Sequence, residues 1–317
     1  MGFKRAVRVT IPATSGNLGS GFDCLGMAVG LYNTVDVEID TLSPSVKKGG
    51  VVLKNIHILG EGCESISKTQ DNVVFTAIKV ALKKAGIHSA GVSLKLVNNI
   101  PVTRGLGSSA AARVGGITAV NAVLNDRFTT EDIINMASKL EGHPDNVVPA
   151  IVGGVCLSYI EDKKIGYIKF DKIKSKIYAI TCIPGFELTT KKARAVLPKN
   201  IPMRNAVYNC ARVGMVTTAF ITGNLRLLDF GMRDKLHQPY RSKLIPGFYK
   251  VYAAAKRAGA MGVALSGAGP TMLAVTESKK TGSIIGERMV SAWKKYNVLA
   301  SYKVLEIDDT GYRVEKV

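Results

Sequence analysis

The sequence predicts an α+β fold made of two closely packed domains. Strand-like and helix-like segments are mixed in the first half of the chain without regular alternation, which disfavours a doubly wound parallel sheet. The pattern of segments changes after about residue 160, so we place the domains at 1–160 and 161–317. The chain has 317 residues, of which 46% are hydrophobic and 21% charged, and it can therefore bury a sizeable core.

The first half of the chain opens with a strand and a glycine-rich loop. Residues 6–11 alternate like a strand that ends at Pro12, and the loop continues to Phe22. Apolar residues at helical spacing before Gly86 indicate one helix, and Thr130 followed by two acidic residues opens another. After the first strand we expect strands at 35–40 and 92–96 and helices at 73–86, 108–124 and 130–140.

The second half contains further strands and helices and no internal repeat. A short strand is expected to run into a second glycine-rich loop, Ser266-Gly267-Ala268-Gly269. Alternating apolar residues indicate the other strands, and apolar residues at helical spacing indicate the helices. These elements are strands at 165–171, 176–183, 271–276 and 302–307 and helices at 190–196, 204–222, 245–258 and 280–296.

Charge and composition narrow the classes of function. The net charge of +19 requires nucleic acid to be considered, but the lysines are scattered in ones and twos without interleaved aromatic residues, so we interpret most of them as solvated. The five cysteines are far apart and the four histidines lack metal-ligand spacing, which argues against a disulfide framework or a zinc site. No apolar run approaches the roughly 18 residues that cross a bilayer. We expect a cytosolic protein with no membrane partner.

The segment Gly105-Leu106-Gly107-Ser108-Ser109-Ala110-Ala111-Ala112 carries the main chemical signal. Glycines allow the backbone to approach a phosphate closely, and the free amides and dipole at a helix start attract it. One serine hydroxyl could bind phosphate while the other binds magnesium. A serine N-cap after a glycine turn would account for the same residues. The segment has no Walker A lysine, and the spacer that begins at Pro101 disfavours a dinucleotide-binding loop.

Other segments change the balance between these two interpretations. Together with the segment above, they resemble the GHMP kinase superfamily and, within it, the homoserine kinases. The likeness covers nearly the whole chain. It is carried by residues 12–23, Glu141-Gly142-His143-Pro144-Asp145-Asn146-Val147, residues 265–271, Ala193-Arg194-Ala195-Val196-Leu197-Pro198 and Gln238-Pro239-Tyr240-Arg241.

The resemblance implies a fold, a cofactor and a set of site residues. The fold would be an N-terminal ribosomal-S5-domain-2-like domain that binds ATP and a C-terminal ferredoxin-like domain, with a homodimer as a family-level expectation. The implied ATP-binding residues are Pro101, Arg104, Gly105, Leu106, Gly107, Ser108, Ser109, Ala110, Ala111, Gly267 and Gly269. Ser109 and Glu141 would bind Mg²⁺. The implied substrate-binding residues are Asn17, Asp23, His143, Asn146, Arg194 and Arg241.

The implied reaction is phosphorylation of the side-chain hydroxyl of L-homoserine by ATP, a step toward threonine. Asp23 would pair with the ammonium group, and the two arginines would bind the carboxylate. Glu141, Asn146, Thr190 and Asp145 are the catalytic candidates. Asp145 lies where some superfamily members have a catalytic aspartate, whereas homoserine kinases are thought to use no carboxylate base. We therefore expect Asn146 and Thr190 to orient the attacking hydroxyl.

Three alternatives stay open. The same fold could phosphorylate another small alcohol, such as mevalonate, shikimate or a sugar, although a neutral sugar needs no arginine pair. A nucleic-acid-binding protein with an S5-like domain would explain the net charge of +19. A catalytically silent relative that only senses its ligand is disfavoured by the presence of both Ser109 and Glu141.

Overall fold

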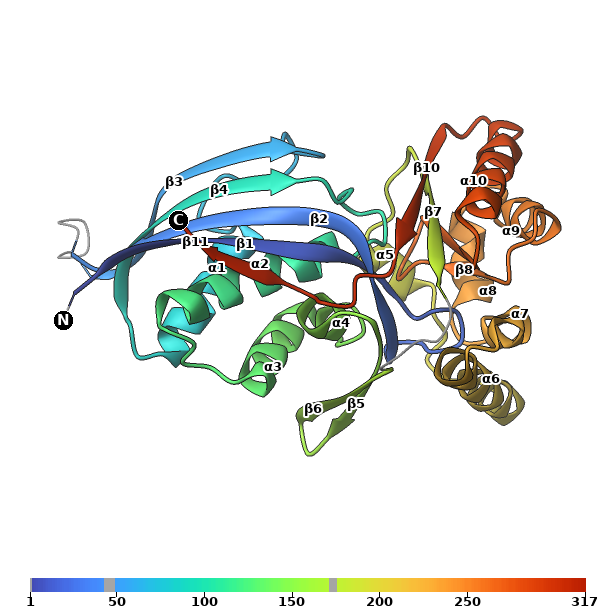
Figure 1. Cartoon of the computed structure of the whole chain (residues 1–317), viewed down its shortest axis with the longest axis horizontal. Coiled ribbons are helices and arrows are strands. Elements are labelled where there is room, and N and C mark those ends of the chain that lie inside the picture. Colours follow the sequence, from blue (N-terminus) through green and yellow to red (C-terminus); the bar gives the residue numbers. More distant parts are fainter. Residues whose placement is uncertain (1, 43–48, 171–175) are drawn as a thin grey trace.

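The computed structural model describes residues 2–42, 49–170 and 176–317. Within these ranges the molecule is elongated, with one β-sheet in each half (Figure 1). The first sheet has the strand order β11-β1-β2-β4-β3, and a hairpin of β5 and β6 is attached to β2. Its strands are β1 (Lys4–Gly16), β2 (Leu25–Asp40), β3 (Gly50–Gly60), β4 (Ser89–Asn98), β5 (Val155–Glu161), β6 (Lys164–Lys169) and β11 (Arg313–Lys316).

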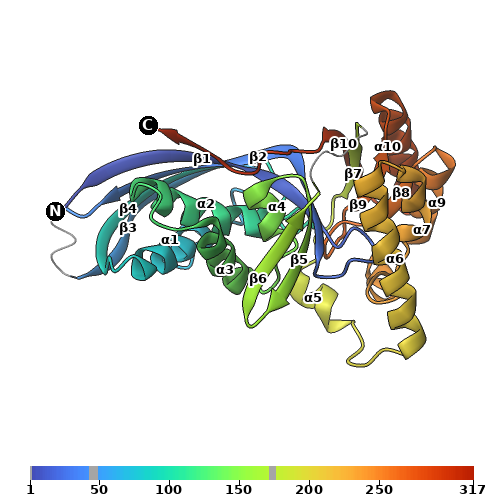
Figure 2. The ribbon, with the colours of Figure 1, turned by 60° about the horizontal axis from the view of Figure 1, so that its bottom comes forward.

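Helices cover one face of the first sheet and leave the other face open (Figures 1 and 2). They are α1 (Val73–Lys84), α2 (Ser108–Val123), α3 (Thr130–Glu141) and α4 (Val147–Val152). The central helix, α2, has two adjacent glycines where it meets its neighbours. A Cβ atom on Gly115 would lie 2.8 Å from Ile11 Cδ1, and one on Gly116 would lie 2.6 Å from the Val74 carbonyl oxygen. These glycines allow α2 to approach both β1 and α1 closely.

The second sheet has the order β10-β7-β9-β8. Its strands are β7 (Tyr178–Pro184), β8 (Gly262–Leu265), β9 (Met272–Thr276) and β10 (Ala300–Glu306). Helices α9 and α10 pack on it around the fully buried Trp293, and the long α6 lies beside α7 at the outer end (Figure 2). The helices are α5 (Thr190–Ala195), α6 (Met203–Thr222), α7 (Leu228–Gly231), α8 (Gln238–Arg241), α9 (Phe248–Arg257) and α10 (Lys279–Lys294), with 3₁₀ turns at Leu225–Leu227 and Ser242–Leu244.

Two expected boundaries are wrong. β1 does not end at Pro12 but continues to Gly16, with a register irregularity between Pro12 and Ala13. Proline is tolerated there because β11 pairs only with residues 7–10, so Pro12 lies on an open edge. β2 starts at Leu25, ten residues before the expected strand. The sequence reading also missed several elements: β3, α4, β5, α7, α8 and β11.

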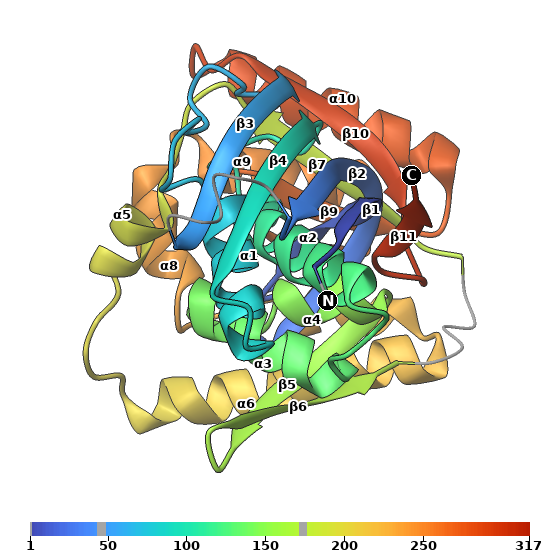
Figure 3. The same cartoon turned by 90° about the vertical axis from the view of Figure 1, so that its left-hand side faces the viewer.

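The two sheets do not divide the chain after residue 160. That point falls inside the β5–β6 hairpin, whose strands both belong to the first sheet. The chain then builds the second sheet and returns, because β11 pairs antiparallel with β1 (Figure 3). The strand expected at 165–171 is β6, and residue 171 lies outside the described ranges. Among the described residues, no helix combines the length and the apolar character needed to span a membrane.

Candidate active site

A cavity of about 360 Å³ lies where loops of the two halves meet. It gathers site residues that are far apart in the sequence. Those that line it are Asn17, Asp23, Pro101, Arg104, Gly105, Leu106, Gly107, Ser108, Ser109, Glu141, His143, Asp145, Asn146, Thr190, Arg194, Arg241, Gly267 and Gly269. Ala110 and Ala111 are instead fully buried in the core, and the Ala111 amide donates a hydrogen bond to the Gly107 carbonyl over 2.9 Å.

The helix start expected to bind phosphate has the geometry of an anion site. Gly107 is the N-cap of α2, in the left-handed conformation with φ 70°, and no side chain caps the first amides. The alternative of a serine N-cap is therefore wrong. A Cβ atom at Gly107 would lie 2.0 Å from Thr14 Oγ1, so this position requires glycine. The uncapped amides and the helix dipole leave a place for an anionic group.

The second glycine-rich loop supports this helix start from the opposite half. Ser266 Oγ donates a hydrogen bond to the Gly105 carbonyl over 2.7 Å, and the Thr271 amide donates to the Arg104 carbonyl over 3.2 Å. A Cβ atom on Gly105 would lie 2.3 Å from the Ser266 carbonyl oxygen. The loop at Arg104 and Gly105 therefore contacts the loop at residues 266–271 through backbone atoms. This contact fixes the first amides of α2 relative to the second sheet.

The two expected magnesium ligands lie together at the ends of two helices. Ser109, in the first turn of α2, donates a hydrogen bond to Glu141 Oε2 over 3.0 Å, and Glu141 is the last residue of α3. Two adjacent ligands of octahedral Mg²⁺ with bond lengths of about 2.1 Å are separated by about 3.0 Å, so these oxygens fit the ion. Burial raises the pKa of Glu141, while Arg113, His143 and the Ser109 hydroxyl act in the opposite direction.

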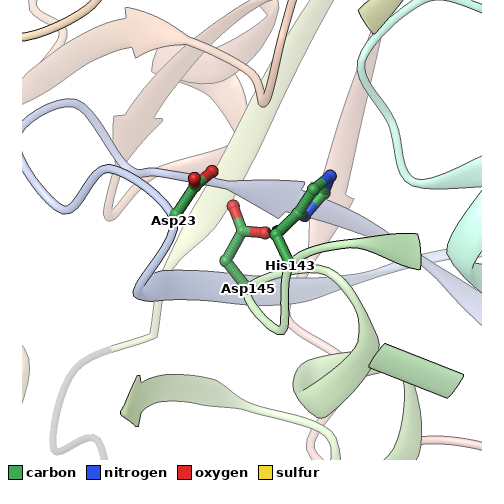
Figure 4. A group of neighbouring side chains, drawn as sticks. All are labelled: Asp23, His143 and Asp145. Atoms are coloured by element: carbon green, nitrogen blue, oxygen red, sulfur yellow. Dashed lines mark hydrogen bonds and ion pairs between the residues drawn. The ribbon is translucent and has the colours of Figure 1, made fainter. Parts of the chain in front are cut away.

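Two aspartates and a histidine lie close together in the cavity; we call them the acidic cluster. One ligand atom each from Asp23, His143 and Asp145 lies within 4.8 Å of the others (Figure 4). His143 Nδ1 is 2.5 Å from Asp145 Oδ1. Burial by itself would lower the pKa of His143, but Asp145, with Glu141 and Asp23, raises it above its usual value. The cluster is a negative environment suited to a cationic group.

Two arginines enter the cavity from the second half of the chain. Arg194 binds Asp23 through two hydrogen bonds of 2.8 and 3.0 Å. Arg241 is 1% exposed and donates to the carbonyl oxygens of Ala193 and Gly267. Burial, with the nearby Arg194, lowers the pKa of Arg241 to about 10. The guanidinium groups lie 5.6 and 5.2 Å from the Phe22 ring centroid, so one aromatic ring lies beside both arginines.

The remaining candidates differ in what their side chains already contact. Asn146 Oδ1 accepts a hydrogen bond from Thr14 Oγ1, and its amide nitrogen donates to Asp145 Oδ1. Asn17 bonds the backbone at Gly267 and at Asp23, which makes it a positioning residue for the loop. Thr190, the first residue of α5, is exposed at the rim of the cavity.

Away from the acidic cluster the cavity becomes apolar. Ile66, Val73, Leu96 and Val102 line this part, which offers flat apolar contact to a ring system. Asn72 also lines it, but its side chain caps α1 by accepting from the amides of the second and third residues after it. One cavity therefore brings together apolar side chains, an uncapped helix start, an acid–hydroxyl pair and a group of charged side chains.

Comparison with known proteins shows the family to which the chain belongs. Residues 72–154 match the model for the GHMP kinase N-terminal domain, and residues 217–295 match that for the C-terminal domain. The homoserine kinase of Caldicellulosiruptor bescii is 40% identical over 98% of this chain and 97% of its own. That of Carboxydothermus hydrogenoformans is 44% identical over 90% of each chain. The chain belongs to the homoserine kinase family of the GHMP kinases.

The solved structures agree with the family. The crystal structure of homoserine kinase from Cytophaga hutchinsonii superposes with a TM-score of 0.87, at 31% identity over 98% of both chains. The two-domain GHMP kinase fold expected from the sequence is confirmed. Mevalonate kinase from L. major shares the fold with a TM-score of 0.66 at 14% identity over 96% of this chain and 95% of its own. The fold by itself therefore does not identify the substrate.

Two residues at the candidate site, Arg113 and His237, were not predicted from the sequence. Arg113 contacts both Ser109 Oγ and Glu141 Oε2, and its position one helical turn after Ser109 was a signal that could have revealed it. His237 is fully buried, accepts from Arg241 through Nδ1 at 3.2 Å, and lies 2.8 Å from the Gly19 carbonyl oxygen through Nε2. His237 therefore positions the buried arginine, and its spacing of four residues from Arg241 was the available signal.

Proposed function

We propose that this protein transfers the γ-phosphoryl group of ATP to the side-chain hydroxyl of L-homoserine, giving ADP and O-phospho-L-homoserine on the route to threonine. The proposal depends on one observation: an uncapped helix start, an acid–hydroxyl pair and an ion pair of opposite charges all line the same cavity. The relatives named homoserine kinase, which match over nearly the whole chain, support the same substrate.

ATP would extend from the apolar end of the cavity to the charged end. Its adenine would lie against Val73, Leu96 and neighbouring apolar side chains, and its phosphates would accept hydrogen bonds from the first amides of α2. The backbone of the second glycine-rich loop, at Gly267 and Gly269, would face the same phosphates. Of the two buried alanines, only Ala110 would contribute its amide, because the Ala111 amide donates to the Gly107 carbonyl.

Mg²⁺ would be held by Ser109 Oγ and Glu141, together with phosphate oxygens and water. When bound, it would neutralise charge on the transferring phosphoryl group. The spacing of 3.0 Å between the two oxygens supports this assignment, as does the hard-oxygen character of the pair. Two protein ligands suit Mg²⁺, which keeps several water molecules and phosphate contacts.

The amino acid would bind by its two opposite charges. Asp23, with the acidic cluster of His143 and Asp145 beside it, would accept the ammonium group, and Arg194 and Arg241 would bind the carboxylate. Asp23 and Arg194 form an ion pair with each other, so a zwitterion can satisfy both partners of that pair at once. An alcohol with only one charged group would pair with either Asp23 or Arg194 and leave the other without a partner.

Positioning would supply most of the catalysis, since phosphoryl transfer has a loose transition state. Asn146 and Thr190 would orient the substrate hydroxyl toward the γ-phosphorus. Asp145 Oδ1 is engaged by His143 Nδ1 and by the side-chain amide of Asn146, which supports a positioning role for this carboxylate. The hydroxyl oxygen forms the new P–O bond, the bond to ADP breaks, and the hydroxyl proton leaves with the transferred phosphate or to solvent.

The test is ADP release with and without Mg²⁺ across a panel of L-homoserine, mevalonate, shikimate and a neutral sugar. We expect release that depends on both homoserine and Mg²⁺. Turnover of another alcohol, with none on homoserine, would reject the substrate assignment and leave the kinase. Absence of ATP turnover on every alcohol would reject the kinase as well. The proposal describes a cytosolic enzyme that acts on a small molecule and not on nucleic acid, with a homodimer expected from the family.

A further inference from the structure

An arginine lies on the two atoms that would bind magnesium. Arg113 is one turn after Ser109 on α2, and its Nη1 contacts both Ser109 Oγ and Glu141 Oε2. The Arg113 side chain is 21% exposed and that of Glu141 is 11% exposed, so this ion pair is partly shielded from water. Arg113 is not among the residues that line the cavity, which means that it reaches the pair from the side.

The guanidinium and a metal ion would bind the same oxygen lone pairs. Ser109 Oγ donates a hydrogen bond to Glu141 Oε2 and accepts one from Arg113, and Glu141 Oε2 accepts hydrogen bonds from both residues. A divalent cation at these oxygens would replace the Arg113 contacts and would be repelled by a positive group at the same distance. Arg113 Nη1 and a divalent cation would therefore compete for Ser109 Oγ and Glu141 Oε2.

We propose that Arg113 is an internal competitor of the divalent cation: it closes the metal subsite of the empty protein and is displaced when the cation arrives with the nucleotide. This inference rests on the proposed function, because it takes Ser109 and Glu141 as the metal ligands. Arg113 keeps the buried Glu141 paired while no metal is present, so that no uncompensated carboxylate is left in a low-dielectric site. The cation gains phosphate oxygens as ligands when it enters as the nucleotide complex, and free cation lacks that gain.

The competition predicts a tighter metal site when the arginine is removed. The apparent affinity of a site is proportional to the fraction of the protein in which the site is open. A charge-assisted hydrogen bond to a partly buried carboxylate corresponds to a factor on the order of ten. Nucleotide-free Arg113→Leu should therefore bind free Mn²⁺, a paramagnetic substitute for Mg²⁺, about tenfold more tightly than the wild-type protein.

The experiment titrates nucleotide-free proteins with Mn²⁺ and measures the free ion by electron paramagnetic resonance. Arg127→Leu is the matched control, because it removes the same charge from an exposed position on the loop before α3. Its Mn²⁺ affinity should equal that of the wild type. Arg113→Leu with Glu141→Gln should lose the gain, since the carboxylate that binds the ion is then neutral. Circular dichroism confirms folding, and Arg113→Gln takes the place of Arg113→Leu if the latter does not fold.

Unchanged or weaker Mn²⁺ binding in Arg113→Leu would overturn the competition, as would a gain equal to that of Arg127→Leu. A gain that survives Glu141→Gln would also overturn it, by placing the ion elsewhere. The ADP-release test on the wild-type protein separates the two proposals. Homoserine-dependent turnover together with unchanged Mn²⁺ affinity removes only the role of Arg113, whereas absence of turnover removes the kinase assignment whatever the titration gives.

Discussion

Replacing Gly107 with alanine probes the helix start that would bind phosphate. The new Cβ atom would lie 2.0 Å from Thr14 Oγ1, and real contacts of this kind are not shorter than 3.0 Å, so the two must separate by about 1 Å. The Thr14 hydroxyl donates a hydrogen bond to Asn146, and its backbone amide donates one to the Leu106 carbonyl. The strain therefore passes to Asn146 and to Leu106. Overpacking of this kind costs about 1–3 kcal/mol, and alanine at φ 70° costs about 1–2 kcal/mol more.

The same shift should damage catalysis more than folding. Displacing the phosphate-facing amides by about 1 Å lowers turnover by on the order of 10²-fold. Gly86→Ala is the matched control, because Gly86 has φ 77° but no atom within 4 Å of an added Cβ. It should lose about 1–2 kcal/mol of unfolding free energy and keep its turnover. Urea unfolding and steady-state kinetics measure both quantities. If Gly107→Ala and Gly86→Ala behave alike in both, the close approach at Gly107 does not shape the site.

Three further predictions test other parts of the site. Glu141→Ala should lower turnover by on the order of 10²–10³-fold, whereas Asp145→Asn should keep substantial turnover; equal collapse of both in steady-state assays would point to Asp145 as a general base. Arg241→Leu should raise the KM for homoserine by about 10- to 100-fold and leave that for ATP nearly unchanged, and an equal rise in both would contradict its role at the carboxylate. The raised pKa of His143 implies a stabilising charge that is fully present below about pH 6.5 and is lost as the pH rises through the higher pKa of the folded state. Urea unfolding of His143→Gln should therefore show its largest deficit relative to wild type at pH 6 and a smaller one at pH 9, and a deficit that grows with pH would refute this.

The parts of the fold set by local chemistry were predictable. The helix expected at 108–124 is α2, Ser108–Val123, because a glycine turn and a run of alanines specify it without distant contacts. Tertiary placement decided the failures. Pro12 ends a strand by local rules, yet β1 continues because it stays paired with β2 as far as Gly16, and proline is tolerated because β11 does not reach residue 12. β11 consists of four exposed residues whose strand exists only because β1 lies beside it.

The candidate site divides in the same way. The glycine-rich segment predicts a helix start through its own backbone, and α2 begins at Ser108 as expected. The pairing of Asp23 with Arg194 joins residues 171 positions apart, which no local pattern could reveal. The burial of Ala110 and Ala111 follows from how α2 packs on the sheet, so a motif alone could not separate lining from support.

The return of β11 to the first sheet ties the second half of the chain back to the first. The chain passes between the halves once from β6 to β7 and once from β10 to β11. The halves also share one hydrophobic core, in which Val216 and Phe220 of α6 and Leu273 of β9 join the buried residues of the first sheet. The last strand therefore completes the sheet with which the chain began, although the chain reaches it only after building the second sheet.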